Sequence, residues 1–141
     1  MRKIAVVYWS GTGNTEEMAR AVAEGIRTAG AQADLMIPGE FDAAKAGEYD
    51  AIAFGCPSMG VEQLEETEFA PMFEAVKQSL SGKRIALFGS YGWGDGEWMR
   101  SWEKDCRDAG ADLACDCVIC NEAPDEEAVQ ACGALGKTLA A

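Results

Sequence analysis

The residues with the clearest chemical potential form a short loop near the N-terminus. Residues 10–15 read Ser-Gly-Thr-Gly-Asn-Thr, between an apolar run and a segment with helical spacing. The two glycines let the backbone curl, so that N–H groups and the hydroxyls of Ser10, Thr12 and Thr15 can surround phosphate oxygens at the positive end of a helix. The loop lacks the lysine of the nucleotide-binding pattern Gly-x-x-x-x-Gly-Lys-Ser/Thr. It therefore favours a phosphate monoester that is anchored rather than cleaved. The simpler alternative is a polar turn that Asn14 or Thr15 caps.

Length and composition indicate one folded domain over residues 1–141. Of the 141 residues, 48% are hydrophobic, which is enough to bury a core. Every apolar run is shorter than the ~20 residues that span a bilayer. The N-terminal run enters the glycine-rich loop without a cleavage-like site. We therefore expect a cytoplasmic protein, and we expect it to be a monomer.

The charge of the chain is strongly negative. Twelve Lys and Arg residues face 24 Asp and Glu residues, which gives a net charge of −12, and there is no histidine. Such a surface repels nucleic acid and anionic membranes. We therefore expect no nucleic acid or membrane partner, but a protein partner with a basic docking surface. The absence of histidine excludes Ser-His and Cys-His catalysis.

Three of the six cysteines, Cys115, Cys117 and Cys120, are close in sequence. Their spacing lacks the paired Cys-x-x-Cys knuckles of structural zinc sites. Cys115 and Cys117 alternate with Asp116 along an expected strand, so both are predicted to face the same side as small buried residues. We expect reduced thiols and no metal.

Strands and helices alternate along the chain, which predicts an α/β three-layer sandwich with a parallel sheet. The expected strands are 3–9, 32–37, 51–56, 84–90 and 112–119. The first, third and fourth are almost continuously apolar, as central parallel strands are, whereas the other two contain polar residues and belong at the edges. This gives five strands in the order 2-1-3-4-5.

Four helices are expected, three of them between strands and one after the last strand. The first carries Met18, Val22 and Ile26 and ends at Gly30. The others carry apolar residues at helical spacing, namely Phe69, Phe73, Val76 and Leu80; Trp98, Trp102 and Cys106; and Val129, Cys132, Leu135 and Leu139. Pro71 is expected in the first turn of its helix, and Asp125 is expected to cap the last one.

In such a sheet, ligands bind at the carboxyl ends of the strands, beside the reversal between strands one and three. Three loops, 10–15, 57–62 and 90–96, converge there. Trp93 stands between two glycines and belongs to no strand or helix face, so its ring suits a flat ligand stacked against it. Trp9 and Tyr91 end strands, and both ring contact and core packing remain open for them.

The second loop offers an apolar side chain and a carboxylate around a tight turn. Met59 and Glu62 flank Gly60, so the thioether can cover a ring and the carboxylate can accept a hydrogen bond from a ring N–H. The alternative is an acidic, solvated loop, since Glu65, Glu66 and Glu68 follow.

Three segments together resemble short-chain flavodoxins. They are Trp9–Thr15, Cys56–Gly60 and Phe88–Gly96, and the similarity extends over essentially the whole chain. The resemblance implies the flavodoxin-like fold and non-covalently bound FMN. It also implies a low-potential one-electron carrier, not an enzyme, that cycles mainly between semiquinone and hydroquinone.

The resemblance also assigns cofactor-binding roles. The FMN phosphate is held by Ser10, Thr12, Asn14 and Thr15, together with the amides of Gly11 and Gly13. Ser58 and Ser90 lie near the ribityl chain, and Met59 and Trp93 flank the isoalloxazine. Glu62 accepts from ring N3–H, and the other cofactor-binding residues are Tyr91, Gly92 and Asn121. The peptide after Gly60 is expected to flip on one-electron reduction, which glycine permits. Relatives often carry a polar residue at the position of Val61, and the β-branched valine is stiffer. We therefore expect Val61 to affect the potential of the semiquinone.

Acidic residues near the ring suit a low potential, because they oppose an anionic reduced flavin. The candidates are Glu62, Glu65, Glu66, Asp95 and Glu97. An FMN-dependent quinone or NAD(P)H reductase would need a nicotinamide domain or a proton donor, and the sequence offers neither. A receiver-type signalling domain would need acids after strand one, where Tyr8 and Trp9 stand.

Overall fold

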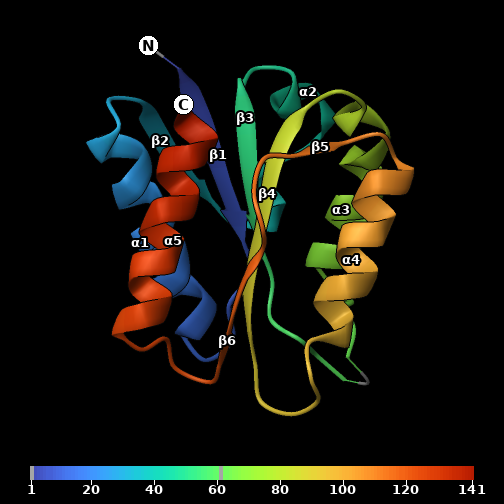
Figure 1. Ribbon diagram of the computed structural model, residues 1–141. Coiled ribbons are helices and arrows are strands. Elements are labelled where there is room, and N and C mark those ends of the chain that lie inside the picture. The colour runs from blue at the N-terminus through green and yellow to red at the C-terminus, as the bar shows by residue number, and fades with distance from the viewer. Residues whose placement is uncertain (1, 61) are drawn as a thin grey trace.

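The computed structural model describes residues 2–60 and 62–141. A parallel sheet lies at its centre with helices on both faces (Figure 1). The strands are β1 (Lys3–Tyr8), β2 (Gln32–Met36), β3 (Ala51–Gly55), β4 (Arg84–Tyr91), β5 (Asp112–Leu113) and β6 (Val118–Asn121). The helices are α1 (Asn14–Thr28), α2 (Ala43–Ala46), α3 (Phe69–Val76), α4 (Glu97–Asp108) and α5 (Glu126–Ala140), with 3-10 turns at Pro38–Glu40 and Lys77–Leu80.

The strand order is β2-β1-β3-β4-β5, with β6 also paired to β4. All pairings are parallel. All five residues of β3 are buried, whereas β2 and β5 carry exposed residues at the edges. The predicted fold class, strand order and edge strands are therefore confirmed.

The fifth strand is not the single run predicted for 112–119. Ile85 pairs with Leu113 and Phe88 pairs with Val118, so β4 advances three residues while the outer chain advances five. The two extra residues leave the ladder as in a β-bulge, and the strand divides into β5 and β6.

This interruption overturns the prediction that Cys115 and Cys117 face the same side. Cys115 packs against the core under α1 and α5, whereas Cys117 packs against the core under α3 and α4. Strict alternation requires extended, paired backbone. Residues 114–117 lie outside the strands, so the alternation rule does not apply to them.

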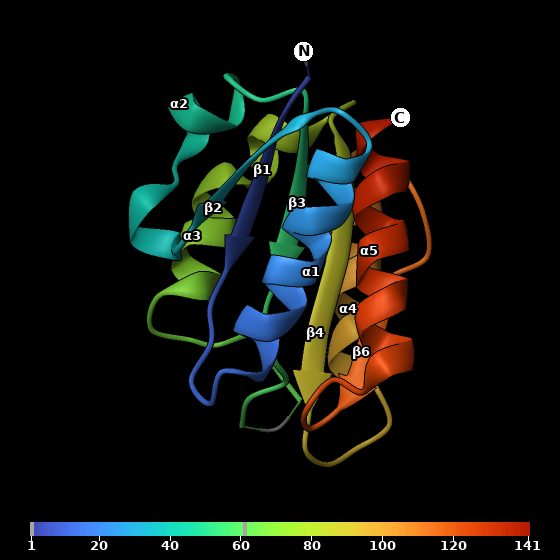
Figure 2. The ribbon, with the colours of Figure 1, turned by 90° about the vertical axis from the view of Figure 1, so that its left-hand side faces the viewer.

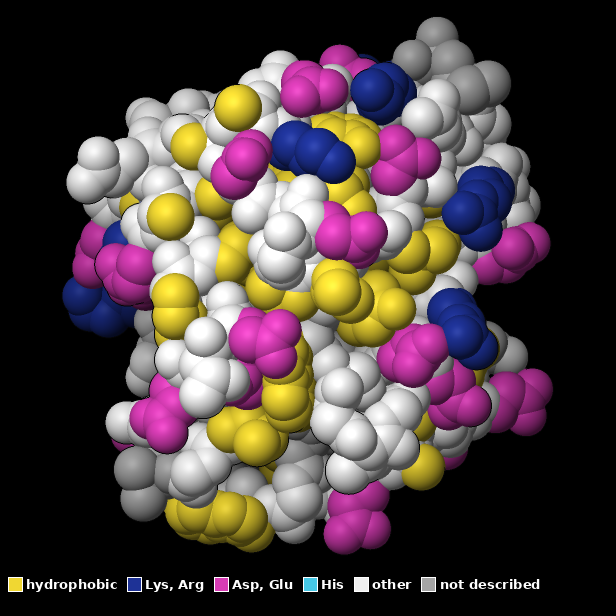
Figure 3. Space-filling view, turned by 180° about the vertical axis from the view of Figure 1, so that it is seen from behind, with side chains coloured by type: hydrophobic (Ala, Val, Ile, Leu, Met, Phe, Trp, Pro, Cys, Tyr) yellow, Lys and Arg dark blue, Asp and Glu magenta, His cyan; other side chains and the backbone are white. Residues whose placement is uncertain are grey.

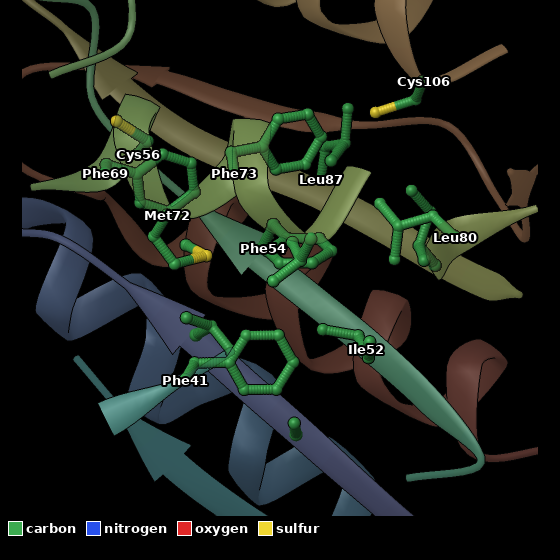
Figure 4. Close-up of a cluster of buried hydrophobic side chains, with 14 of the residues drawn as sticks. Phe41, Ile52, Phe54, Cys56, Phe69, Met72, Phe73, Leu80, Leu87 and Cys106 are labelled. Atoms are coloured by element: carbon green, nitrogen blue, oxygen red, sulfur yellow. The ribbon is translucent and has the colours of Figure 1, made fainter. Parts of the chain in front are cut away.

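The core has two parts, one on each face of the sheet. Under α3 and α4 it is built from large rings, and Figure 4 shows Phe54 on β3 next to Phe69 and Phe73 from α3. Trp98 and Trp102 of α4 are buried there, as their spacing predicts. Under α1 and α5 the core consists mainly of alanine and aliphatic side chains.

The four predicted helices form, with two differences in extent: α3 ends before Leu80, which lies in a 3-10 turn, and the short helix α2 was not predicted. One residue on a predicted buried face also differs. Pro71 lies in the first turn of α3, and the Asp125 carboxylate caps α5 by accepting from the N–H of Ala128 at 2.8 Å. Val129, predicted to be on the buried face of α5, is 37% exposed. The neighbouring Ala128 is buried in its place.

The strands β1, β3 and β4 point toward the same end of the molecule (Figure 2). The N- and C-termini lie at the opposite end in this view. The loops after these strands therefore meet at one edge, where parallel α/β sheets bind ligands.

Candidate functional site

A cleft of about 470 Å³ opens at the carboxyl ends of the strands. It is lined by Trp9, Gly11, Thr12, Asn14, Pro57, Ser58, Met59, Ser90, Tyr91, Gly92, Glu122 and Ala123. All three predicted loops contribute, together with the loop between β6 and α5. The volume is in the usual range for a small-molecule or cofactor site.

Eight of the predicted cofactor-binding residues line this cleft and seven do not. Those that line it are Gly11, Thr12, Asn14, Ser58, Met59, Ser90, Tyr91 and Gly92. Those outside the lining are Ser10, Gly13, Thr15, Gly60, Glu62, Trp93 and Asn121. Pro57, Glu122 and Ala123 were not predicted, although Glu122 and Ala123 directly follow Asn121, which was.

The loop before α1 leaves the start of the helix open. Gly13 occupies the N-cap position with a φ of 95° and no side-chain capping bond, so the predicted alternative of a cap from Asn14 or Thr15 is wrong. Ser10 Oγ instead accepts from the N–H of Gly13 at 3.1 Å. The first amides of a helix lack intrahelical partners and favour an anion. Thr12 and Asn14 lie on the cleft beside them.

Thr15 has a structural contact that the sequence did not reveal. Its side chain is 1% exposed, and its hydroxyl lies 3.1 Å from that of Ser90 at the end of β4. The carbonyl of Ser90 also accepts from the N–H of Ser58 at 2.9 Å. Thr15, Ser58 and Ser90 therefore join the three loops to each other.

The Trp9 ring lies against the loop at residues 10–15. A Cβ added at Gly11 would lie 3.0 Å from the Trp9 ring, so a side chain there would require the ring to shift. The indole Nε1 donates to Glu68 at 3.4 Å. Trp9 and Tyr91 both line the cleft and both pack against the aromatic core, so core packing does not remove them from the site.

The second loop forms a closed turn beside the cleft. Met59 and Gln63 exchange backbone hydrogen bonds of 2.7 and 2.8 Å. Gly60 has a φ of 57° and Glu62 a φ of 49°, both in the left-handed region. Met59 is 39% exposed. Val61, for which an effect on the semiquinone potential was predicted, lies outside the described residues.

Trp93 is on the surface, as its position between glycines predicts. Its side chain is 61% exposed, the largest value among the exposed large hydrophobic residues of the described chain. Burying such a ring against a flat partner removes its apolar surface from water.

The carboxylates near the cleft differ in their surroundings. Glu65, which the alternative interpretation placed in a solvated acidic loop, is 4% exposed. Its carboxylate accepts from the Thr67 hydroxyl and from the N–H groups of Thr67, Glu68 and Phe69, the last two at 2.7 and 2.8 Å. Burial alone would raise the pKa of Glu65, but these donors outweigh it and hold the pKa below its usual value.

Asp95 is also engaged. Its carboxylate accepts from Arg100 at 2.9 Å, and this bond lowers the pKa of Asp95. The lining of the cleft contains one carboxylate, that of Glu122, and no lysine or arginine. A bound phosphate would therefore meet amides and hydroxyls instead of a cation.

The cysteines are free thiols in the structure. Burial raises the pKa of Cys117 to about 12 and that of Cys120 to about 11. Residues 2–60 and 62–141 contain no group of three His, Cys, Asp or Glu side chains arranged to hold a metal ion. Across the same residues, no helix combines the length and apolar character needed to cross a bilayer.

Comparisons with known proteins agree with this geometry. The family model for Flavodoxin matches residues 6–135. Flavodoxin from Clostridium beijerinckii is 43% identical over 135 residues, covering 96% of this chain and 97% of the relative, and flavodoxin from Megasphaera elsdenii is 39% identical over 137 residues, covering 97% and 98%. The solution structure of two-electron reduced Megasphaera elsdenii flavodoxin superposes with a TM-score of 0.89 at 40% identity, covering 97% and 98% of the two chains. The chain therefore belongs to the flavodoxin family, whose members bind FMN and carry electrons between redox partners rather than acting as enzymes.

Proposed function

We propose that this chain is a low-potential one-electron carrier that binds FMN non-covalently in the cleft and cycles mainly between semiquinone and hydroquinone. The single observation that carries the proposal is that the two ends of the cleft differ in chemical character. One end presents hydroxyls and the uncapped start of α1, and the other is lined by Met59 and by Gly92, the residue before the exposed Trp93.

The residues present fit FMN at both ends. Thr12, Asn14 and the amides of the loop bind the phosphate through hydrogen bonds, supported by the dipole of α1. Ser10 shapes this loop through its bond to Gly13, and Thr15 fixes the helix start through Ser90, so both act by holding the loop.

The other predicted cofactor-binding residues are assigned to the parts of FMN in the same way. Ser58 lies beside the ribityl chain, and Met59 and Trp93 take opposite faces of the flavin, with Tyr91 and Gly92 in the adjoining wall. Ser90 and Asn121 belong to the same wall, since Asn121 Nδ2 donates to the carbonyl of Tyr91 at 3.4 Å. Gly60 supports the predicted peptide flip, because its positive φ shows a backbone that a glycine adopts without strain.

The negative field supports a low potential. Two unit charges about 10 Å apart interact by roughly 1.7 kcal/mol at an effective dielectric constant of 20, and about 1.4 kcal/mol corresponds to roughly 59 mV for one electron. Asp95 contributes less than the sequence predicted, because the cation of Arg100 pairs with it. Glu65 keeps its charge, since its hydrogen-bond donors are neutral and hold its pKa low. Glu62, Glu65, Glu66 and Glu97 remain as the acids that oppose the reduced flavin.

We further propose a monomer in the cytoplasm whose partners dock through basic surfaces. Figure 3 shows Asp and Glu side chains over much of one face, interspersed with Lys, Arg and hydrophobic side chains. The net charge of −12 attracts a basic partner and raises its association rate.

The test compares FMN with riboflavin, which lacks the phosphate, by quenching of flavin fluorescence on the full chain. The proposal predicts that FMN binds at least about 100-fold more tightly, since two or three charge-assisted hydrogen bonds are lost with the phosphate. Equal affinity for the two flavins would show that the loop at residues 10–15 does not bind the phosphate.

A further inference from the structure

The start of α4 is held by a carboxylate from a different loop. Glu62 Oε1 accepts from the N–H of Glu97, the first residue of α4, at 3.1 Å. The N-cap residue, Gly96, has a φ of 94° and no side chain with which to cap the helix. Because the first amides of a helix lack intrahelical partners, a carboxylate placed there stabilises the helix start.

A second observation shows that the loop before α4 is shaped around this carboxylate. A Cβ added at Gly94 would lie 2.5 Å from the carboxyl atoms of Glu62, and Gly94 has a φ of +86°. Glycine at this position therefore both turns the loop and leaves space for the Glu62 side chain.

The backbone of Glu62 supports the same interpretation. Its φ of 49° is in the left-handed region, which is uncommon for residues other than glycine and costs free energy. This backbone directs the side chain away from its own turn and toward the segment 94–97. The nearby carboxylate of Asp95 pairs with Arg100 at 2.9 Å, and the N–H of Glu97 makes a smaller contribution to the lowered pKa of Asp95.

We propose that Glu62 is a positioning residue that ties the turn at 59–63 to the start of α4. The two loops that carry Met59 and Trp93 thereby keep a fixed separation before a cofactor enters. In its relation to FMN the inference rests on the proposed function. One oxygen accepts from Glu97, and the other has no hydrogen-bond donor among residues 2–60 and 62–141. It is available to a ring N–H, so a single carboxylate can join the flavin to α4.

The test measures solvent exchange of the Glu97 amide proton by NMR in the full chain, with and without FMN. Glu62→Ala should speed exchange about tenfold without FMN, because the charge-assisted bond is lost. Glu62→Gln should speed it less than about threefold, since its carbonyl oxygen still accepts. Glu66→Gln, which removes an exposed charge from the same acidic segment, is the matched control and should leave the rate unchanged.

A second variant keeps the carboxylate but displaces it. Gly94→Ala should speed exchange of the Glu97 amide about as much as Glu62→Ala, and adding it to Glu62→Ala should change the rate little further. An unchanged rate in both single variants would overturn the inference. If these variants also bind FMN like the parent, the proposed function stands without it. If the parent chain binds no FMN, the proposed function fails, and the exchange rates still decide whether Glu62 holds α4.

Discussion

The two faces of the sheet hold their helices by different means. Under α3 and α4, rings meet edge to face, with Phe54 centred 5.3 Å from Phe73 and 6.5 Å from Phe69. Between α1 and α5, backbones meet directly, because a Cβ at Gly136 would lie 2.2 Å from the carbonyl oxygen of Val22. One face depends on large side chains and the other on their absence.

The two kinds of helix packing also support different ends of the cleft. The helix α1 follows the loop expected to hold the phosphate, whereas α3 and α4 follow the loops that carry Met59 and Trp93. Backbone contact leaves little room for adjustment, while side-chain packing can rearrange when volume is kept. The phosphate end is therefore the more rigidly placed of the two, and the ring end depends more on side-chain contacts.

The largest effect is expected on the aromatic face. Phe54→Ala should lower the free energy of unfolding by about 3–5 kcal/mol, because it leaves a cavity among three rings. Urea unfolding followed by circular dichroism measures this loss. Phe54→Leu, which keeps most of the volume, should cost clearly less. Similar losses for the two variants would contradict the view that ring packing holds this face.

The other face is tested with a glycine pair. Gly136→Ala should cost about 1–3 kcal/mol, since the added methyl group forces α1 and α5 apart. Gly133→Ala is the matched control in the same helix, because its Cβ would lie 4.0 Å from the nearest atom, the Ala21 carbonyl oxygen. It should gain up to about 1 kcal/mol from helix propensity. Losses of equal size would show that direct backbone contact is not what joins these helices.

A buried carboxylate distinguishes the start of α3. Glu65→Gln should cost about 1–2 kcal/mol at neutral pH, because it weakens several charge-assisted hydrogen bonds. Since folding lowers the pKa of Glu65, its contribution is complete above the ordinary glutamate value of about 4.3 and is lost as the pH falls through the folded value. Unfolding midpoints of the two proteins should therefore converge in acid, and a constant difference across pH would refute this.

At the ring end, Trp93→Ala should weaken FMN binding by about tenfold and raise flavin fluorescence, because a stacked quencher is removed. The stability of the FMN-free chain should change little, given the exposure of the ring. Val129→Ala, another exposed apolar position, is the control. Unchanged affinity and emission would place Trp93 away from the flavin.

The smallest expected effect concerns the turn at Gly60. Alanine there must adopt a left-handed backbone at a cost of about 1 kcal/mol. If the flipped peptide stabilises the half-reduced flavin, Gly60→Ala should yield less blue intermediate during stepwise reduction. An identical yield would remove this turn from the redox step.

Much of the architecture could be predicted because it depends on local pattern. Continuous apolar runs mark β1, β3 and β4 as central, and the isolation of Trp93 between glycines marks it as exposed. The break in the fifth strand could not be predicted. Ala114 and Cys115 suit a strand as well as a bulge, and only the register against β4 reveals the extra residues.

The contacts within the site were harder to predict, because they join distant positions. Thr15 and Ser90 are 75 residues apart, and their hydroxyls meet only when α1 and β4 pack together. Glu65 looks like its acidic neighbours in sequence, yet its burial and its amide donors give it a different role. The loops could be located from the sequence, but the partner of each side chain could not.

Stepwise anaerobic reduction of the full chain loaded with FMN, followed by absorbance, tests the central claim most directly. The account predicts one equivalent of bound flavin and a blue one-electron intermediate that accumulates before full reduction. A demonstrably folded chain that retains no FMN, or a bound flavin that passes to full reduction without this intermediate, would contradict it.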